Sequence, residues 1–337
     1  NALADVDTST TAPTEGQTIK WNGTNWVPGD IEEAAASSTQ KAIFGYGYTN
    51  TRTTITNLVS STGVVATDTN AAGTAKSAGA AAGYGGDKAI FGFATMDTSG
   101  SNETNLVSNT GVVSSDVTGV GTVRNGVSAA GFGGDKAIFG FGSTSAATNI
   151  TNLVSNAGVV ATDTTGVGTG RGTLAAAGFG GDKAIFGFGT DDYSDSDLSI
   201  TNLVSNTGVV ATDTTGASGV TGRRDLAAAG FGGDKAIFGF GTGSDNYGYI
   251  SYMYSITNLV SNTGVVASDT TGVGTAKREL YGAGYGGDKA IFGYGYDGSN
   301  RVNHTNLVSN AGVVASDTTG VGTARDGVAA AGYSTTA

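Results

Sequence analysis

The sequence predicts an all-β protein, and three observations lead to this class. A segment recurs six times at spacings of 47–54 residues, and each copy carries short β-type runs separated by turn residues. Glycine supplies 58 of the 337 residues without a three-residue period, a density that disfavours helices. No copy has the 3.6-residue apolar period of an amphipathic helix. We predict a six-bladed β-propeller of four-stranded antiparallel blades, closed by the C-terminal strand, with a short N-terminal assembly segment.

The repeat is defined by short strings that keep their spacing. Asparagine and aspartate lie 11 residues apart in all six copies, as in Asn57 and Asp68, so this stretch tolerates no insertion. A basic residue follows the aspartate and precedes a run of small residues in every copy. The string KAIFG marks the start of each predicted blade, at Lys41, Lys88, Lys136, Lys183, Lys235 and Lys289.

Each copy is expected to contain four strands. In the middle of the chain these are LAAAGFG from Leu174, KAIFGFG from Lys183, ITNLVSN from Ile200 and GVVATDT from Gly208. Gly-Gly-Asp joins the first run to the second, and Asn-Thr-Gly joins the third to the fourth. Both strings accept positive φ and are typical of hairpin turns. The small first strand suits the axis of a propeller, where the blades converge, and the second suits burial on both faces.

The phase of the repeat predicts how the ring closes. The first copy begins at Lys41 without a small-residue strand of its own, and an additional one, Val328 to Tyr333, ends the last copy. This C-terminal strand is therefore expected to pair with the strand at Lys41, which would leave no exposed sheet edge. An open solenoid is the alternative, but it would need capping repeats, and none is visible.

The order R-x-x-L-A-A-A-G, K-A-I-F-G-F-G, N-L-V-S resembles the kelch-repeat propellers over Lys41 to Tyr333. The sequence departs from that pattern in two ways. A single glycine follows the aromatic residue where kelch repeats have a doublet, and valines such as Val209 and Val210 replace a late tryptophan. The resemblance therefore implies either a divergent relative or a convergent propeller, and kelch partners are not carried over.

The first forty residues have a different composition. Both prolines and both tryptophans precede residue 31. We assign 1–30 to an assembly segment, 31–40 to a linker or short helix, and 41–337 to the propeller. The strings Leu3-Ala4-Asp5-Val6, Gly16-Gln17-x-x-Lys20-Trp21 and Asn25-Trp26-Val27-Pro28 resemble a motif of tail-fibre and other virion proteins of tailed phages, notably cyanophages. The resemblance implies a location on the virion surface, contacts with other virion proteins, and a homotrimer.

Composition excludes several functional classes. The formal net charge of −11 disfavours binding to nucleic acid or to anionic membranes. The absence of cysteine excludes disulfides and thiol catalysis. No apolar run reaches the ~18 residues of a membrane helix, and no signal peptide opens the chain. Because Asn1 replaces an initiator methionine, we expect a processed or excised piece of a longer protein.

Few residues suggest chemistry, and we expect neither enzymatic activity nor a cofactor. His304 is the only histidine and lies in a polar connection. Gly293–Gly298 matches GxGxxG, but no helix follows, as dinucleotide binding requires. An acidic cluster could bind calcium, although its spacing fits no known loop and a solvated loop explains it as well; its members are Asp191, Asp192, Asp195 and Asp197. The repeated aspartates and basic residues are expected to join blades, because a catalytic site is usually singular.

The copies differ mainly between their second and third strands, where the inserted sequences are unrelated. These segments should share one face of a rigid scaffold, where recognition usually occurs. The fifth contains four tyrosines among Ser, Gly and Asn, a composition typical of binding loops. We predict that this face binds a host-surface glycan or protein through Tyr193, Tyr247, Tyr249, Tyr252, Tyr254, Arg301 and His304. Neutral drift in tolerant loops, a purely structural decoration or filament subunit, and a secreted lectin or hydrolase remain alternatives.

Overall fold

The computed structural model describes residues 17–21, 24, 26–30, 39–96, 99–191, 197–216, 218–244 and 251–337. The chain divides into two compact units, Asn1–Ala36 and Ser37–Ala337. All regular structure in the described residues is extended, so the predicted all-β class is confirmed. Within these residues there is no helix with the length and apolar character needed to cross a membrane. The predicted linker or helix at 31–40 falls almost entirely outside the described residues.

The first unit contains one antiparallel hairpin. Strand β1 (Gln17–Trp21) pairs with β2 (Trp26–Asp30), with Trp21 opposite Trp26 and Ile19 opposite Pro28. The Trp26 side chain is 40% exposed. A hairpin of two strands has too little surface to bury its own apolar groups.

The second unit contains six antiparallel sheets of three or four strands, one for each copy of the repeat. In every sheet the small-residue strand pairs with the KAIFG strand, which pairs with the TNLV strand. The sheets are β25(Ala329–Tyr333)–β3(Lys41–Gly45)–β4(Ile55–Val59)–β5(Thr69–Asn70); β6(Ala80–Tyr84)–β7(Lys88–Gly92)–β10(Thr104–Val107); β11(Ser128–Phe132)–β12(Lys136–Gly140)–β13(Thr151–Val154); β14(Ala175–Phe179)–β15(Lys183–Gly187)–β16(Thr201–Val204); β17(Ala227–Phe231)–β18(Lys235–Gly239)–β21(Thr257–Val260); and β22(Tyr281–Tyr285)–β23(Lys289–Gly293)–β24(Thr305–Val308).

The prediction of four strands in every copy is wrong for five of these sheets. Only the first has a fourth strand, β5, and it is two residues long. Elsewhere the last segment makes isolated bridges, such as Val204 with Val210 and Thr201 with Thr214. In this segment, as in the first sheet, an asparagine side chain also holds the chain: Asn202 Nδ2 donates to the carbonyl of Ala211 at 2.9 Å and to Asp213 at 2.8 Å.

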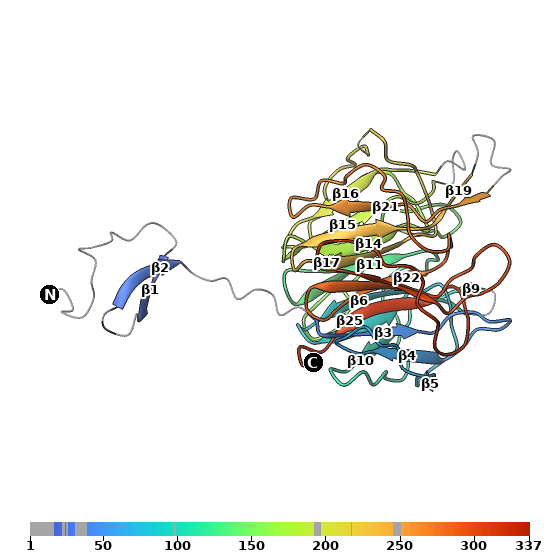
Figure 1. Cartoon of the computed structure of the whole chain (residues 1–337), viewed down its shortest axis with the longest axis horizontal. Coiled ribbons are helices and arrows are strands. Elements are labelled where there is room, and N and C mark those ends of the chain that lie inside the picture. The colour runs from blue at the N-terminus through green and yellow to red at the C-terminus, as the bar shows by residue number, and fades with distance from the viewer. Residues whose placement is uncertain are drawn as a thin grey trace. The chain divides into compact units, whose positions relative to one another are not determined.

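The first and last copies of the repeat share one sheet. Strand β25 pairs antiparallel with β3, with Ala331 opposite Ile43 and Tyr333 opposite Lys41. Figure 1 shows the red C-terminal strand beside the blue β3. The predicted pairing of the C-terminal strand with the strand at Lys41 is therefore confirmed.

Glycine allows the small-residue strands of neighbouring sheets to approach closely. We call these six the innermost strands: β25, β6, β11, β14, β17 and β22. A Cβ atom added to Gly178 would lie 3.3 Å from the carbonyl oxygen of Gly131 in the preceding sheet. The same relation links all six innermost strands and includes Gly83 with Gly332, at 3.3 Å. Each innermost strand thus contacts two others, with β25 between β22 and β6. The small residues predicted for this position are required by the short distance between backbones.

Aromatic pairs hold the sheets together further out. Phe186 is fully buried and lies 5.1 Å, centroid to centroid, from Phe141 of the preceding sheet. Phe44 and Tyr294 form the equivalent pair between the first and last sheets, also at 5.1 Å. Phe141 and Tyr294 have left-handed backbones with φ of 64° and 63°, a conformation that disfavours side chains by ~1–2 kcal/mol. Burial of both rings offsets this strain.

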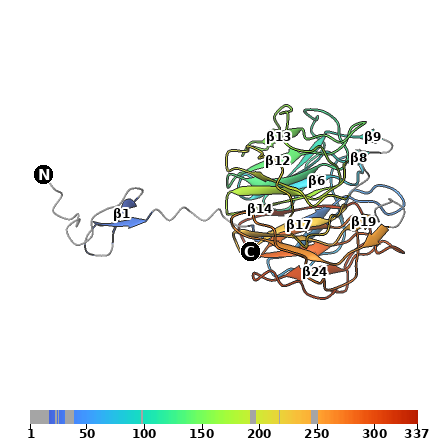
Figure 2. The same ribbon diagram turned by 90° about the horizontal axis from the view of Figure 1, so that it is seen from above.

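The two ends of the second unit differ. At one end, Gly180 and Gly181 form a hairpin turn with positive φ, and the Gly180 N–H donates to the carbonyl of Asp234 in the next sheet at 2.7 Å. Equivalent bonds join all six sheets, the last from Ser334 to Asp87 at 2.8 Å. The variable segments lie at the other end: Figures 1 and 2 both show β9 (Ser99–Gly100) and β19 (Thr242–Ser244) on the side away from the C-terminus. We call this end the variable-loop face.

Candidate functional site

The repeated charged residues are structural joints between sheets. Arg171 is fully buried, and its guanidinium lies 4.4 Å from the ring centroid of Phe141 in its own copy. It donates from Nη2 to Asn202 Oδ1 at 2.6 Å and from Nε to the carbonyl of Phe188 at 2.7 Å, both in the next copy. The cation-to-asparagine bond recurs in every copy, as Lys76–Asn105, Arg124–Asn152, Arg223–Asn258, Lys277–Asn306 and Arg325–Asn57. The expectation that these residues join successive repeats is confirmed.

The aspartate of each copy completes the joint. Asp213 accepts hydrogen bonds from the backbone N–H of Thr169 at 2.9 Å and from its hydroxyl at 2.8 Å. Burial acts to raise the pKa of Asp213, but the hydrogen bonds from Asn202 and Thr169 outweigh it and leave the pKa lowered. Burial lowers the pKa of Arg171 to about 10, against the opposing charge of Asp213. Both groups are therefore ionised at neutral pH and already have partners, so they are not poised for acid–base chemistry.

Of the five tyrosines predicted to bind a ligand, the structure describes two, Tyr252 and Tyr254. Strand β19 (Thr242–Ser244) pairs with β20 (Ser251–Met253), which puts Tyr252 opposite Gly243 with its side chain 49% exposed. Tyr254 is half-buried, and burial, with a smaller contribution from Asp197, raises the pKa of its hydroxyl. Tyr193, Tyr247 and Tyr249 lie outside the described residues. Tyr252 is thus available for contact, whereas Tyr254 packs against the scaffold.

Asp197, one of the four aspartates that could bind calcium or lie in a solvated loop, is instead held by neighbouring groups of the scaffold. Asp197 is 7% exposed and pairs with Arg224 at 2.7 Å. Its second carboxylate oxygen accepts from the backbone N–H of Ser244 at 2.6 Å and from the hydroxyl at 3.0 Å. Asp192 and Asp195 lie outside the described residues. No group of three metal-ligating side chains occurs in the described part of the chain.

His304 and Arg301 have different surroundings. His304 Nε2 lies 3.8 Å from Asp317 Oδ1, and burial, aided by Lys277, lowers the pKa of the imidazole. Among the described residues this Nε2 has no hydrogen-bond partner, so no serine–histidine pair forms. Arg301 instead reaches toward the centre of the variable-loop face, where it pairs with Asp326 at 3.1 Å.

Six residues just before the innermost strands form a collar at the centre of this face. All have left-handed backbones, with φ between 51° and 61°. The N–H of Asp225 donates to the carbonyl of Thr173 at 2.9 Å, and that of Glu279 donates to the carbonyl of Asp225 at 2.9 Å. The collar consists of Ala78, Gly126, Thr173, Asp225, Glu279 and Gly327. Its backbone is fixed by neighbouring sheets, so its side chains have defined positions.

Half of the face around the collar is charged and aromatic, and half is small and neutral. The residue before each collar position forms an isolated β-bridge with one residue of the variable segment that follows it in the chain or, for Asp326, of the first variable segment. Three successive bridges are Ser77–Thr95, Asn125–Ser143 and Gly172–Thr190, and the other three are Arg224–Thr242, Arg278–Tyr296 and Asp326–Tyr48. Departures from the repeat therefore gather in one sector, formed by the last two sheets and the first.

Most charges of this sector are paired. Arg278 lies 3.4 Å from Glu279, and its guanidinium stacks over the ring of Tyr296 at 5.3 Å. Arg301 lies over the ring of Tyr48 at 4.7 Å while it pairs with Asp326. We refer to the charged side chains together as the collar cluster, which consists of Arg224, Asp225, Arg278, Glu279, Arg301 and Asp326.

Asp225 is the exception. No hydrogen bond or ion pair reaches its carboxylate from the described residues. Burial raises the pKa of Asp225 to about 6, although Arg278 and Arg224 act in the opposite direction. Burial, followed by the charge of Asp225, raises the pKa of Glu279 to about 7. Two neighbouring carboxyl groups thus titrate near neutral pH, an arrangement typical of functional sites as well as of buried charge networks.

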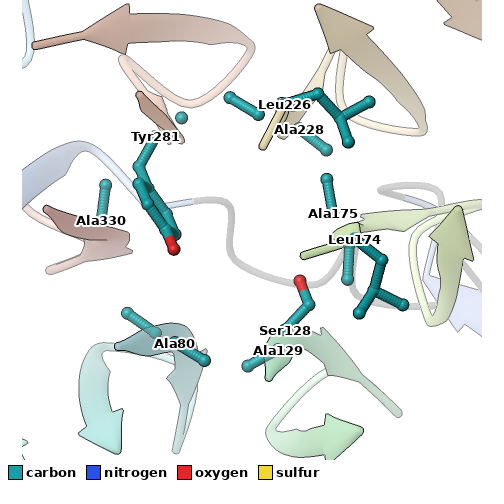
Figure 3. A pocket seen from close by; sticks show the side chains of 13 residues that line it. Ala80, Ser128, Ala129, Leu174, Ala175, Leu226, Ala228, Tyr281 and Ala330 are labelled. Carbon is teal, nitrogen blue, oxygen red and sulfur yellow. The ribbon is translucent and has the colours of Figure 1, made fainter. Parts of the chain in front are cut away.

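A cavity of about 30 Å³ lies between the innermost strands, and its lining includes Leu174 and Leu226, which directly follow two collar residues in the chain. Residues of all six innermost strands line it, and most are alanines. Figure 3 shows the phenol of Tyr281 projecting into this space, with Ser128 among the residues around it. Burial, followed by the charges of Asp225 and Glu279, raises the pKa of the Tyr281 hydroxyl. The cavity accommodates a water molecule or a group of similar size, and not a sugar ring.

Of the collar cluster, only Arg301 was predicted from the sequence. The other members lie outside the variable segments between the second and third strands, where the predicted binding residues were placed. The available signal was the column Ala78, Gly126, Thr173, Asp225, Glu279 and Gly327, in which two acids replace small residues. Tyr281 similarly replaces an alanine or serine of the other innermost strands. No known protein family matches the chain, and no curated protein matches its sequence.

Proposed function

We propose that the six sheets are the blades of a closed six-bladed β-propeller. Four kinds of contact between successive sheets support this arrangement, and each also occurs between the first and last sheets. They are the glycine approach, the aromatic pairs, the hydrogen bonds between hairpin turns, and the cation-to-asparagine bonds. In addition, the C-terminal strand β25 pairs with β3, so that the first blade contains strands from both ends of the repeat region.

We propose further that the protein is a non-enzymatic virion appendage, a tail-fibre-like subunit of a tailed phage that attaches to a host surface. The N-terminal strings that resemble phage fibre proteins support this class. In this proposal the first unit, which contains the 40% exposed Trp26, assembles the subunit as a homotrimer and with other virion proteins. A native mass measurement tests the trimer, since a monomeric or dimeric mass would contradict it.

The observation that carries the attachment function is the difference between the two ends of the scaffold. The hairpin end repeats a Gly-Gly-Asp turn in five copies and a Ser-x-x-Gly turn in six, whereas the variable-loop face has six unrelated segments and an exposed Tyr252. Tyrosine supplies a large, stiff contact area and a hydroxyl group, both of which suit binding to glycans or proteins. Selection for recognition explains why variation is confined to one face.

The test uses labelled full-length protein and a panel of marine cyanobacterial cells. Substitution of Tyr247, Tyr249, Tyr252 and Tyr254 by Ser is expected to abolish binding to the strains that the unmodified protein labels. Folding should persist, because this segment is 7 residues longer than the shortest copy, with Lys-to-Asn spacings of 23 and 16. Circular dichroism and the melting temperature verify this.

The matched control changes the opposite end of the molecule. Asp182→Asn and Asp234→Asn alter half-exposed turn carboxylates that pair with Lys183 and Lys235. These variants should label cells as the unmodified protein does. A folded tyrosine variant that still labels cells would exclude this loop and favour a purely structural subunit.

A further inference from the structure

The hydrogen-bonded ring of the collar is open at one position. Five of its six backbone N–H groups donate to the carbonyl of a neighbouring collar residue, at distances of 2.6 to 3.1 Å. The Gly126 N–H would complete the ring by donating to Ala78, but no hydrogen bond joins it to any described residue. The nitrogen of Gly126 is therefore free to react. The five bonds run from Ala78 to Gly327, from Gly327 to Glu279, from Glu279 to Asp225, from Asp225 to Thr173, and from Thr173 to Gly126.

Asn125, which precedes this glycine, has a side chain that is open to attack. The side chain is exposed, and its Oδ1 accepts a hydrogen bond from the Thr95 hydroxyl at 3.2 Å. Such a donor stabilises the negative charge that forms on this oxygen when a nucleophile adds to Cγ. Nδ2 has no acceptor among the described residues, so no hydrogen bond opposes its departure. The nearest nucleophile, the Gly126 nitrogen, belongs to the adjacent residue, which makes the step intramolecular.

We propose that Asn125 is a site of spontaneous deamidation in the folded protein. Asparagine is among the thermolabile residues, and a glycine in the next position has no side chain to hinder ring closure. The Gly126 nitrogen bonds to Cγ of Asn125, the Cγ–Nδ2 bond breaks, and the N–H proton leaves with the amide nitrogen as ammonia. One water molecule then opens the cyclic imide at either carbonyl and gives aspartate or isoaspartate. The inference goes beyond host attachment, because it concerns the covalent structure of the face whether or not a cell is bound.

Either product changes the small and neutral half of the variable-loop face. A carboxylate replaces an amide in a half whose three bridges contain no charged residue. Isoaspartate also routes the backbone through Cγ and lengthens it by a methylene group. This extension falls within the bridge in which Asn125 and Ser143 exchange two backbone hydrogen bonds, at 2.9 and 2.8 Å. Deamidation therefore makes a slow, one-way change in the charge and the backbone of this face.

Asp326 and Gly327 occupy the equivalent positions at another point of the collar and provide a matched comparison. The Gly327 N–H donates to the carbonyl of Glu279 at 3.0 Å, so its nitrogen is engaged. The Asp326 side chain is buried and pairs with Arg301. Asp326→Asn therefore gives the chain a second described Asn-Gly pair in which the glycine nitrogen is held by a hydrogen bond. The two pairs have the same sequence and differ in their surroundings.

The experiment incubates the purified full chain at pH 8 and 37 °C and follows its asparagines by peptide mapping with mass spectrometry. Conversion raises the mass of the Asn125 peptide by about 1 Da, because a hydroxyl replaces an amino group. In the folded protein Asn125 should convert at least ~10-fold faster than any other described asparagine. In folded Asp326→Asn, the pair at 326–327 should convert at least ~10-fold more slowly than Asn125, whereas in denaturing urea the two pairs should convert at similar rates.

Thr95→Val removes the hydroxyl that donates to Asn125 and should slow the conversion by ~3-fold or more; an unchanged rate would overturn the role of this hydroxyl. The melting temperature of each variant verifies that it folds. Two results would overturn the proposal: protection of Asn125 by more than ~10-fold in the folded chain relative to the denatured chain, or equal conversion of both Asn-Gly pairs in folded Asp326→Asn. All these rates are measured without cells, so this proposal and host attachment fail separately.

Discussion

Arg325 donates a hydrogen bond of 2.7 Å from Nη2 to Oδ1 of Asn57, a residue 268 positions earlier in the chain. Arg325 Nε also donates to the carbonyl of Tyr46 at 2.7 Å, and the guanidinium lies 4.2 Å from the ring of Tyr294. The joint between the last and first sheets therefore has the same contacts as the internal joint at Arg171. This equivalence allows the proposed ring to be tested by matched substitutions.

Arg325→Met and Arg171→Met should destabilise the protein equally. Each removes a buried cation, which deprives the asparagine Oδ1 of its donor and the nearby aspartate of an opposite charge. Such a change typically reduces the free energy of unfolding by ~3–5 kcal/mol. Chemical denaturation of the two variants provides the comparison. If Arg325→Met were near neutral while Arg171→Met was destabilising, the first and last sheets would not be joined as an internal pair is.

Gly178→Ala should be more harmful than Gly181→Ala. A Cβ at Gly178 would lie 3.3 Å from the carbonyl oxygen of Gly131, so two backbones would have to separate. At Gly181 the added Cβ meets nothing within 4 Å, and only the positive φ of 79° opposes it. We expect a loss of ~1 kcal/mol for Gly181→Ala and more for Gly178→Ala, measured by denaturant unfolding. Equal losses would mean that the innermost strands adjust freely.

Stability should fall as the pH rises from about 5 to 8. The folded-state pKa values of Asp225 and Glu279, about 6 and about 7, exceed the ordinary values of 3.8 and 4.5. The folded protein therefore binds more protons than the unfolded chain in this window, so deprotonation favours unfolding. We expect the melting temperature to be ~2–6 °C lower at pH 8 than at pH 5.

Asp225→Asn provides the control for this pH dependence. The variant should melt at more nearly the same temperature at pH 5 and pH 8, because one of the two titrating groups is gone. Below pH 4 both proteins should lose stability together, since protonation of the joint aspartates with lowered pKa values weakens the joints between sheets; these are Asp68, Asp116, Asp163, Asp213 and Asp317. An unchanged pH profile in Asp225→Asn would show that other groups cause the effect.

Repetition made much of the fold predictable. Six copies fixed the strand pairs, the Gly180–Gly181 turn and the return of residues 329–333 to the first sheet. The segment after Gly208 was wrongly predicted to be a strand, because apolar alternation does not reveal that this segment makes only isolated bridges and is also held by the Asn202 side chain. The fixed 11-residue step from Asn202 to Asp213 was the visible trace of that bond.

The candidate site was less predictable, because its residues are defined by their neighbours in space. Asp225 and Glu279 are 54 positions apart and meet only because adjacent sheets place their backbones 2.9 Å apart, donor to acceptor. The left-handed backbone conformation of Phe141 could not be predicted from the sequence either, since aromatic residues rarely adopt positive φ. Comparison of equivalent positions across the copies would have found the two acids, but not the shape of the collar.

The pairing of β3 with β25 has a consequence for synthesis. Strand β3 leaves the ribosome before its partner, which is made 284 to 292 residues later, the separations of the Gly45–Ala329 and Lys41–Tyr333 pairs. At ~5–20 residues per second, the edge of β3 stays uncovered for roughly 15–60 s. During this time it can pair with the same strand of a neighbouring nascent chain on one messenger RNA. Correct production therefore depends on how the cell spaces its ribosomes and shields this edge with chaperones.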